Sequence, residues 1–295
     1  LAQEIAQDIA PSAPARSLAA ARERFLPLPF ATHRAPRVST GHREARLLPL
    51  LTIEDTPPVQ RWIHYFSGKD HERFQRFLSR GSSYRQVVED VLEQNDLPPE
   101  LYYLAMIESG YVTHASSRAK AVGVWQFIRA TGRRYGLESD SYVDERRDPI
   151  RATEAAAKYL RDLYNVFQSW PLALAAYNAG ERRILTAVMK ANTRDFWELA
   201  RKGFLPPETA NYVPKFMAAV TIGRNLARYD FVDVQGEPYP SLEAIEVPSP
   251  VRLRDVAILA GVSDENLKKV NPHLKQGMTP PTEARYEIWV PEEHA

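Results

Sequence analysis

The chain has 295 residues, of which 38 are Lys or Arg and 37 are Asp or Glu, so its formal net charge is +1. This length suits one medium domain with a smaller companion domain. A near-neutral chain without a dense Lys/Arg stripe disfavours nucleic-acid binding, which usually needs a basic surface. The absence of Cys excludes disulfides, thiolate nucleophiles and Cys-based zinc sites. No run of about 18 apolar residues is present, so no membrane-spanning helix is expected.

The first part of the chain is the least regular. Residues 1–57 combine many Pro residues with scattered Arg and show little sustained hydrophobic periodicity. This composition favours an extended arm that wraps the following domain or is partly disordered. The chain begins at Leu1 rather than Met, so we expect a processed or truncated product.

Residues 58–228 have the hydrophobic spacing of helices and almost no strict alternation, which predicts an all-α main domain. Pro, Gly and polar caps mark the expected helix ends. Gly81 is expected to end one helix, and Ser82 or Ser83 to cap the next. The expected helices cover residues 58–66, 70–79, 83–92, 99–109, 125–135, 149–167, 171–177, 181–190 and 206–228.

The last part of the chain predicts a small separate unit. Residues 229–250 are rich in Pro and turn residues and are interpreted as a linker. Two short helices are expected at 251–261 and 263–270, and a strand at 286–291. A unit of about 45 residues cannot bury much core alone. The two expected helices and the expected strand together predict a small α+β unit over residues 251–295.

Glu108 is a carboxylate in an unusual position. Helical spacing places it on the same face as Leu101, Leu104 and Ala105, so it ends an apolar stripe. Gly110 follows as a helix stop, where the negative end of the helix dipole disfavours a carboxylate. Burial and the dipole both raise its pKa, which keeps a general acid protonated near neutral pH. The spacing alone leaves open a boundary Glu that reaches solvent or pairs with a nearby Arg.

Four short segments stand out along the chain: Ile-Glu-Ser at 107–109, Gly-Val-Trp-Gln-Phe at 123–127, Ala-Ala-Tyr-Asn-Ala-Gly at 175–180 and Pro-Pro-Glu-Thr-Ala-Asn-Tyr-Val-Pro-Lys at 206–215. Together they resemble the signature of the family 1 lytic transglycosylases, which are goose-lysozyme-like enzymes that cleave peptidoglycan. One short motif would be weak, but their shared order and spacing are specific. The resemblance implies an all-α, lysozyme-like catalytic domain over residues 58–228.

The resemblance implies that Glu108 is the catalytic residue, first as general acid on the glycosidic oxygen and then as base. It implies non-hydrolytic cleavage of the MurNAc-GlcNAc β-1,4 bond, in which the MurNAc 6-hydroxyl attacks its own anomeric carbon and forms a 1,6-anhydro ring. Ordinary glycosidases need a second carboxylate about 5–10 Å away. An intramolecular hydroxyl removes that need.

The resemblance also assigns substrate contacts before residue 130. Ser117 matches a serine that contacts the substrate near the reacting sugar, although a plain loop Ser is the alternative. Gly123 and Gln126 match an element in which Gly permits close backbone approach and Gln bonds sugar groups. Trp125 either stacks on a sugar ring or belongs to the core.

Further substrate contacts are assigned in the later motifs. Tyr177 is expected to bond the catalytic carboxyl or the substrate, and Asn178 to brace the backbone. Either residue is alternatively a satisfied core polar group. Glu208 matches a second Glu in the substrate groove, and Tyr212 follows one helical turn later. Both are assigned to substrate binding, with a helix-start Glu favoured by the dipole as the alternative for Glu208.

Residues 251–295 resemble a LysM module, the βααβ unit that binds N-acetylglucosamine chains. The likeness rests on residues 253–257, 261–263, 270–272 and 288–291. The usual opening is replaced by Ser-Pro-Val-Arg-Leu at 249–253, and residues 278–285 look inserted. Packing against the catalytic domain is therefore at least as strong an expectation as glycan binding.

No cofactor is expected, and the seven His residues lack a ligand spacing such as His-x-x-x-His, which disfavours a metal site. The inferred partners are peptidoglycan glycan strands and not nucleic acid. We expect a monomer in the periplasm or cell envelope, and the resemblance implies an outer-membrane lipid anchor in the unprocessed form. Two alternatives stay open: a goose-type muramidase that uses water, and a non-catalytic peptidoglycan-binding or scaffold protein.

Overall fold

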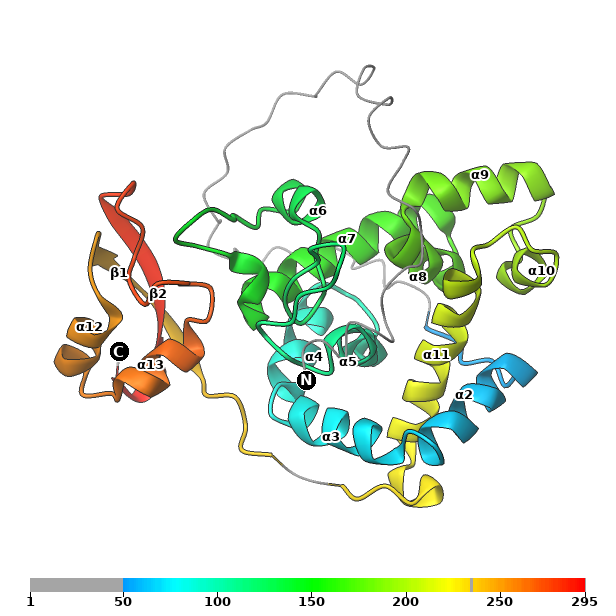
Figure 1. Cartoon of the computed structure of the whole chain (residues 1–295), viewed down its shortest axis with the longest axis horizontal. Coiled ribbons are helices and arrows are strands. Elements are labelled where there is room, and N and C mark those ends of the chain that lie inside the picture. The colour runs from blue at the N-terminus through cyan, green and yellow to red at the C-terminus, as the bar shows by residue number, and fades with distance from the viewer. Residues whose placement is uncertain (1–49, 234–235, 295) are drawn as a thin grey trace, which may run out of the picture.

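The computed structural model describes residues 50–233 and 236–294. Most of these residues are helical, and a small two-stranded unit follows at the C-terminal side, which confirms the expected fold class (Figure 1). The arm expected over residues 1–57 lies largely outside the described residues. Its last part, residues 50–56, is irregular chain that leads into the first described helix.

The helical domain runs from α2 to a short 3-10 helix at Leu226–Tyr229. Its α-helices are α2 (Pro57–Ser67), α3 (His71–Ser82), α4 (Arg85–Gln94), α5 (Tyr102–Ser109), α6 (Arg129–Arg134), α7 (Pro149–Phe167), α8 (Trp170–Ala179), α9 (Glu181–Ala191), α10 (Phe196–Arg201) and α11 (Pro207–Arg224). Local chemistry sets these ends, as α7 shows. The Asp148 side chain accepts hydrogen bonds from the backbone N–H groups of Ile150 and Arg151, and Pro149 occupies the first helical position.

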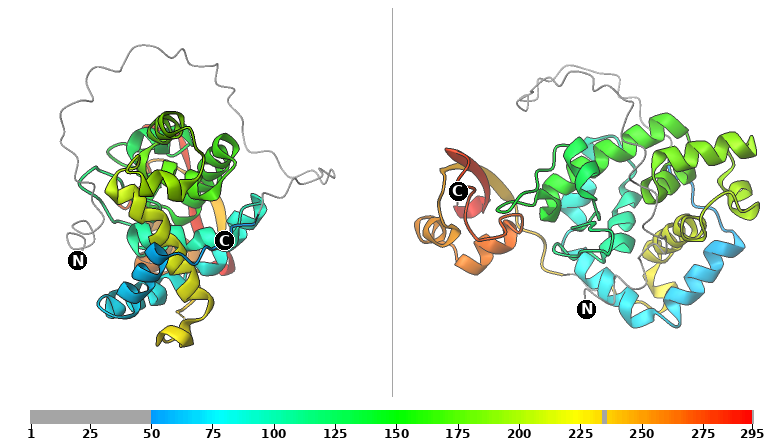
Figure 2. Two further views of the ribbon diagram at one scale, coloured as in Figure 1. Left: turned by 90° about the vertical axis from the view of Figure 1, so that its right-hand side faces the viewer. Right: turned by 45° about the horizontal axis from the view of Figure 1, so that its top comes forward.

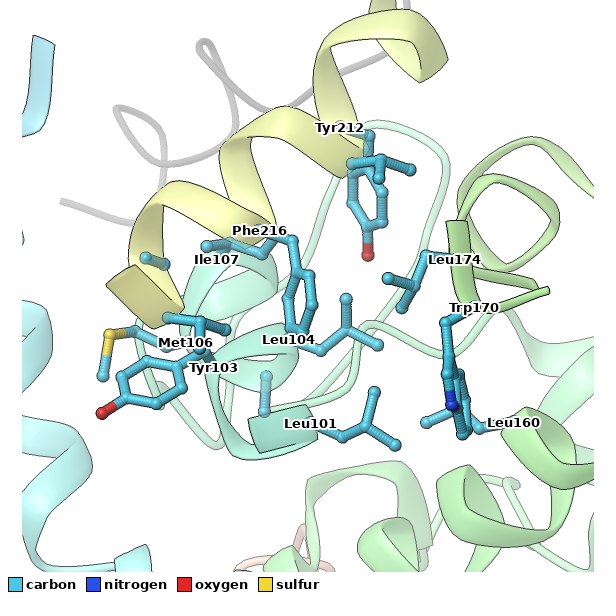
Figure 3. Packing of buried hydrophobic residues seen from close by; sticks show 14 of the residues in the cluster. Leu101, Tyr103, Leu104, Met106, Ile107, Leu160, Trp170, Leu174, Tyr212 and Phe216 are labelled. Atoms are coloured by element: carbon cyan, nitrogen blue, oxygen red, sulfur yellow. The ribbon is translucent and has the colours of Figure 1, made fainter. Parts of the chain in front are cut away.

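Helix α5 lies at the centre of the helical domain, and each of its residues is buried. Helices α3, α4 and α11 pack against it, and α8 packs against α11 and α7. Figure 3 shows Tyr212 and Phe216 projecting from α11 toward Leu104 of α5. Because α5 is surrounded by packed side chains, the residues at its C-terminal end have fixed positions.

The end of α3 differs from the sequence-based prediction. Gly81 lies inside α3, and a side chain there would overlap the Tyr102 hydroxyl. This Gly therefore serves close packing and does not end the helix. Neither expected Ser caps α4, because the N-cap is Tyr84 and the Ser82 hydroxyl donates to the Ser79 carbonyl at 2.9 Å.

The helix expected over residues 125–135 is shorter, since α6 begins only at Arg129. Gly123 (φ +86°) and Gln126 (φ +49°) adopt left-handed backbone conformations that interrupt a helix. Val122 and Phe127 instead pair across an antiparallel bridge. Helix α10 was not expected, because its six residues are too few to show a periodic pattern.

The C-terminal unit contains strands β1 (Leu242–Pro248) and β2 (Arg285–Pro291) and helices α12 (Leu253–Ala260) and α13 (Asp264–Val270). The strands pair antiparallel, with Ile245 opposite Ile288. Strand β1 lies within residues 229–250, so the expected linker is too long at its C-terminal end. Its burial signal is weak, because only Val247 of β1 is fully buried, which explains why the sequence did not reveal it.

The C-terminal unit packs against the loop that precedes α7, at one end of the molecule (Figure 2). Val143 of this loop belongs to the hydrophobic core of the unit and pairs with Leu274 in a β-bridge. The Trp289 indole N–H donates to Asp148 Oδ2 at 2.6 Å, and Arg151 lies 3.1 Å from the Glu287 carboxylate. The unit is thus joined to the helical domain by apolar, polar and ionic contacts.

Candidate active site

Glu108 occupies the last turn of α5. The helix ends where Gly110 adopts a left-handed conformation (φ +57°) and its N–H donates to the Met106 carbonyl at 2.7 Å. Only 9% of the Glu108 surface is exposed. The predicted apolar stripe is therefore real, and the carboxyl at its end is buried rather than solvated.

The environment of Glu108 changes its acidity. Burial is the main cause, and with the nearby Glu208 carboxylate it raises the pKa of Glu108 to about 7. A hydrogen bond from Tyr212 and the positive charge of Lys215 act in the opposite direction. A carboxyl with this pKa is substantially protonated at neutral pH, as a general acid must be.

Tyr212 bonds directly to the buried carboxyl. It lies on α11 and its hydroxyl donates a hydrogen bond to Glu108 Oε1. Burial raises the pKa of the Tyr212 phenol well above its ordinary value, so the phenol remains a donor. The sequence assigned Tyr212 to substrate binding, and the structure adds this direct contact.

A cavity of about 560 Å³ opens at Glu108. Its lining comes from the loop after α5 and from six helices, which are α2, α5, α6, α7, α8 and α11. Of the residues predicted from the sequence, those that line it with Glu108 are Ser117, Gln126, Tyr177, Asn178, Glu208 and Tyr212. The structure thus brings residues of all four motifs to one cavity.

The loop after α5 is held by its own hydrogen bonds. The Ser117 hydroxyl accepts from the Ala121 N–H at 3.1 Å, and the Gln126 amide donates to the Gly123 carbonyl at 2.8 Å. Gly123 itself is not among the residues that line the cavity. A side chain at Gly123 would overlap the Arg146 carbonyl oxygen, so the close backbone approach is to the protein rather than to a ligand.

Tyr177 and Trp125 are joined to each other. The Tyr177 hydroxyl donates to the Trp125 carbonyl at 2.7 Å, so in this structure it bonds the loop and not the Glu108 carboxyl. Trp125 has no exposed surface, and its indole N–H donates to Thr153 Oγ1 at 2.8 Å. Of the two alternatives for Trp125, the structure selects the core residue.

Asn178 links α8 to α11 across the cavity wall. Its amide N–H lies 3.3 Å from Glu208 Oε1, and its amide oxygen accepts from the Thr209 hydroxyl at 2.8 Å. Asn178 was expected to brace the backbone, but these bonds hold the side chains of Glu208 and Thr209 at the start of α11. Glu208 is thereby fixed at the edge of the cavity.

Further cavity residues were not predicted. Asn211 and Lys215 lie on the cavity face of α11, at helical spacing from Glu208 and Tyr212, so extending the motif along one helix face could have found them. Trp62 of α2 also lines the cavity. No local pattern marks Trp62, because its role depends on how α2 packs against α11.

Residues 50–233 and 236–294 contain neither a metal-binding cluster nor a membrane-spanning helix. No group of three or more His, Cys, Asp or Glu residues there is arranged to hold a metal ion. Within the same ranges, no helix has the length and apolar character needed to cross a membrane.

Comparison with protein families places three of the four motifs, those between residues 107 and 180, in a known domain. Residues 88–200 match the family described as Transglycosylase SLT domain, and residues 241–295 match Lytic transglycosylase MltD, LysM-like domain. The chain contains an SLT-type transglycosylase domain followed by an MltD-type LysM-like domain. The second match begins just before β1, so this strand belongs to the LysM-like domain and not to a linker.

Two curated relatives of the chain are also named transglycosylases. The chain is 36% identical over 221 residues to membrane-bound lytic murein transglycosylase D of Escherichia coli K12, covering 73% of this chain and 48% of the relative. It is 36% identical over 103 residues to peptidoglycan transglycosylase gp16 of Escherichia phage T7, covering 34% and 8%. The solved complex of the 70-kDa soluble lytic transglycosylase with bulgecin A matches at a TM-score of 0.46 and 22% identity, covering 57% and 28%. The chain spans about half the length of the transglycosylase D relative.

Proposed function

We propose that this protein is a peptidoglycan lytic transglycosylase that cleaves the MurNAc-GlcNAc β-1,4 bond without water and leaves 1,6-anhydroMurNAc ends. The observation that carries the proposal is the Glu108 carboxyl, which is buried at a cavity with its pKa raised to about 7. The SLT-type domain and the transglycosylase D relative support the same chemistry.

One carboxyl serves both proton transfers in this mechanism. Protonated Glu108 donates its proton to the glycosidic oxygen as the bond to the MurNAc anomeric carbon breaks. The resulting carboxylate then accepts the proton of the MurNAc 6-hydroxyl, whose oxygen forms the new bond to that carbon. Glu108 ends protonated, as it began, and the Tyr212 hydroxyl stabilises the carboxylate between the two steps.

The other cavity residues bind and position the glycan. Ser117, Gln126 and Asn178 supply hydroxyl and amide groups for sugar hydrogen bonds, and Glu208 accepts from sugar hydroxyls. Tyr177 keeps the loop in place through the Trp125 carbonyl. We assign Gly123 to the shape of this loop rather than to substrate contact.

A hydrolytic muramidase is the second candidate, because Glu208 is another carboxylate at the same cavity. As a muramidase, the protein would use Glu208 to activate a water molecule. The hydrogen bond from Asn178 and the placement of Glu208 on the first turn of α11 favour a binding role instead.

The proposed substrate places the protein in the periplasm or cell envelope. The transglycosylase D relative is named membrane-bound, which supports association with a membrane. We propose that this is the outer membrane and that a lipid anchor in the unprocessed form attaches the protein to it. Glycan strands of peptidoglycan are the proposed partner, and we propose that the protein acts as a monomer.

Digestion of purified peptidoglycan followed by mass spectrometry of the fragments tests the function. We expect anhydro-muropeptides from the unmodified protein, and a loss of rate of about 10²–10⁴-fold in Glu108→Gln. Glu208→Gln should weaken binding but keep the anhydro products. Glu154→Gln, an exposed carboxyl of α7, is the matched control.

The alternative outcomes separate the other candidates. Reducing-end fragments that disappear in Glu208→Gln would assign a hydrolase. A protein that binds peptidoglycan without releasing fragments would be a non-catalytic scaffold, and the proposed chemistry would be wrong.

A further inference from the structure

Among the charged side chains that line the cavity, one is a cation and the others are carboxylates. Among the described residues that line the cavity, Glu108 and Glu208 are the acidic groups and Lys215 is the single Lys or Arg. Lys215 lies one helical turn after Tyr212, which bonds Glu108, and it lines the same cavity. Its charge accordingly lowers the pKa of the Glu108 carboxyl. The ammonium group therefore lies near the reacting end of the cavity and is not on a remote surface.

Trp62 holds this ammonium group in place. Lys215 Nζ lies 5.6 Å from the centroid of the Trp62 ring, within the range of a cation–π contact. The Trp62 ring is itself packed against Tyr65 (5.4 Å between centroids) and Phe66 (5.5 Å) of the same helix. A flexible Lys side chain that is already ordered loses less entropy when it binds an anion.

The two residues come from helices that the SLT match does not cover. Helix α2 precedes residue 88 and Lys215 follows residue 200, the two limits of the match. Helices α2 and α11 pack side by side, as Figure 1 shows, and this packing brings Trp62 to the cavity. The chain outside the matched region thus contributes charge and an aromatic ring to the cavity.

The substrate class explains what such a cation could recognise. MurNAc differs from GlcNAc by an O-linked lactyl group that ends in a carboxyl, and this carboxyl is either free or joined to a peptide stem with carboxylates of its own. A Lys ammonium in a partly desolvated cavity attracts a carboxylate more strongly than it would in open solvent. A glycan made only of GlcNAc offers no such group.

We propose that Lys215, ordered by Trp62, forms a subsite for a carboxylate carried by the muramyl sugar and thereby distinguishes muramyl glycans from GlcNAc-only glycans. The subsite rests on the proposed function, since it assumes that the cavity binds peptidoglycan. Its ligand is the lactyl carboxylate of a peptide-free sugar or a carboxylate of the attached stem.

Binding measurements on the full chain test the subsite without interference from cleavage. Isothermal titration calorimetry in a Glu108→Gln background compares four probes: a GlcNAc tetramer, a peptide-free GlcNAc-MurNAc tetrasaccharide, the same tetrasaccharide with its lactyl carboxylates converted to amides, and a stem-bearing tetrasaccharide. We expect Lys215→Met to weaken binding of a carboxylate-bearing probe about tenfold, with less than about twofold change for the GlcNAc tetramer and the amide form. Lys215→Arg should retain most of the affinity, and Lys190→Met, an exposed Lys of α9, is the matched control.

The probes also identify the source of the carboxylate. If Lys215→Met loses affinity only for the peptide-free tetrasaccharide, the lactyl carboxylate is the ligand of Lys215. If it loses affinity only for the stem-bearing tetrasaccharide, a carboxylate of the peptide is the ligand. Trp62→Leu should reduce the same affinity about threefold, since it removes the cation–π contact but keeps the charge.

Three results would overturn the subsite. The first is an equal loss of affinity for all four probes in Lys215→Met, and the second is no loss of affinity for any probe. The third is a Lys215→Met variant of the active protein whose pH profile of activity moves while its KM stays constant. If the unmodified protein still produces anhydro ends in these cases, the transglycosylase function stands and only the subsite is wrong. If no probe binds and no anhydro ends form, both proposals fail.

Discussion

The Glu108 carboxyl experiences two opposing influences. Burial raises its pKa and so favours the protonated acid, whereas the Tyr212 hydroxyl stabilises the ionised form. A residue that acts first as acid and then as base needs both forms within reach of neutral pH. The pairing of a buried carboxyl with a single phenol donor provides this balance.

Replacing Tyr212 with Phe should disturb that balance in a defined direction. Loss of the hydrogen bond raises the pKa of Glu108 further, so the alkaline limb of the pH profile of kcat, near pH 7 in the unmodified protein, should move to higher pH. Because a hydrogen bond to a charged group contributes about 1.5–3 kcal/mol, kcat should fall about ten- to a hundredfold. Rates of anhydro-product formation across pH measure both effects. Tyr135→Phe removes a phenol outside the cavity lining, and an identical profile in both variants would disprove the coupling.

The sequence predicted the buried position of Glu108 at the end of α5, but it did not predict the contact with Tyr212. Residues 101–108 and Gly110 place the carboxyl at the end of a buried stripe by local spacing alone, and the structure agrees. Tyr212 lies 104 residues away, and its bond to Glu108 depends on how α11 packs on α5. Local patterns do not determine such packing, so the motif identified Tyr212 as a site residue without its contact.

At the scale of elements, the loop between α5 and α6 determines the shape of the cavity. A helix was expected to begin at Trp125, so residues 125–127 were assigned to its first turn. Two left-handed residues, Gly123 and Gln126, instead fold them into a tight loop that turns Gln126 to the cavity. Helix α7 was predicted at its observed ends because Pro149 and a 19-residue pattern mark it clearly. A short loop with unusual backbone angles has no comparable signal.

Gly123→Ala tests how strictly this loop is built. The new side chain would overlap the Arg146 carbonyl and would also occupy a positive-φ conformation, so we expect a loss of at least about 2 kcal/mol in the free energy of unfolding. For a protein of this size, that corresponds to a fall in Tm of about 4–8 °C. Gly136→Ala is a matched control, since Gly136 has φ +90° but nothing within 4 Å of the added carbon. Equal melting temperatures in the two variants would show that the contact with Arg146 does not constrain the loop.

At the scale of the whole molecule, Asp148 joins the two domains. Its carboxylate caps α7 through the N–H groups of Ile150 and Arg151, and it accepts the indole N–H of Trp289 from the C-terminal unit. The ring of His273 lies 3.2 Å from the same carboxylate, and both side chains are fully buried. The N-terminal end of α7 in the helical domain and the docking of the LysM-like domain therefore both depend on the Asp148 carboxylate.

This arrangement makes stability depend on pH in a predictable way. Burial alone raises the pKa of Asp148, but the close contact and charge of His273, the charge of Arg151 and the hydrogen bond from Trp289 outweigh it and hold the pKa below its ordinary value. A lowered folded-state pKa gives stabilisation that is fully present above the ordinary Asp pKa of about 4 and is lost as the pH falls through the folded-state value.

Asp148→Asn should remove this dependence together with the stabilisation. We expect unfolding in urea, followed by circular dichroism, to show a loss of about 2–3 kcal/mol at neutral pH and a shallower decline of stability in acid. Asp162→Asn changes an exposed carboxyl of the same helix and should leave both quantities nearly unchanged. If the two variants lose stability in parallel from neutral to acid pH, the buried carboxylate does not hold the domains together. A selective loss in Asp148→Asn would instead show that the LysM-like domain and the catalytic helices share one stabilising charge.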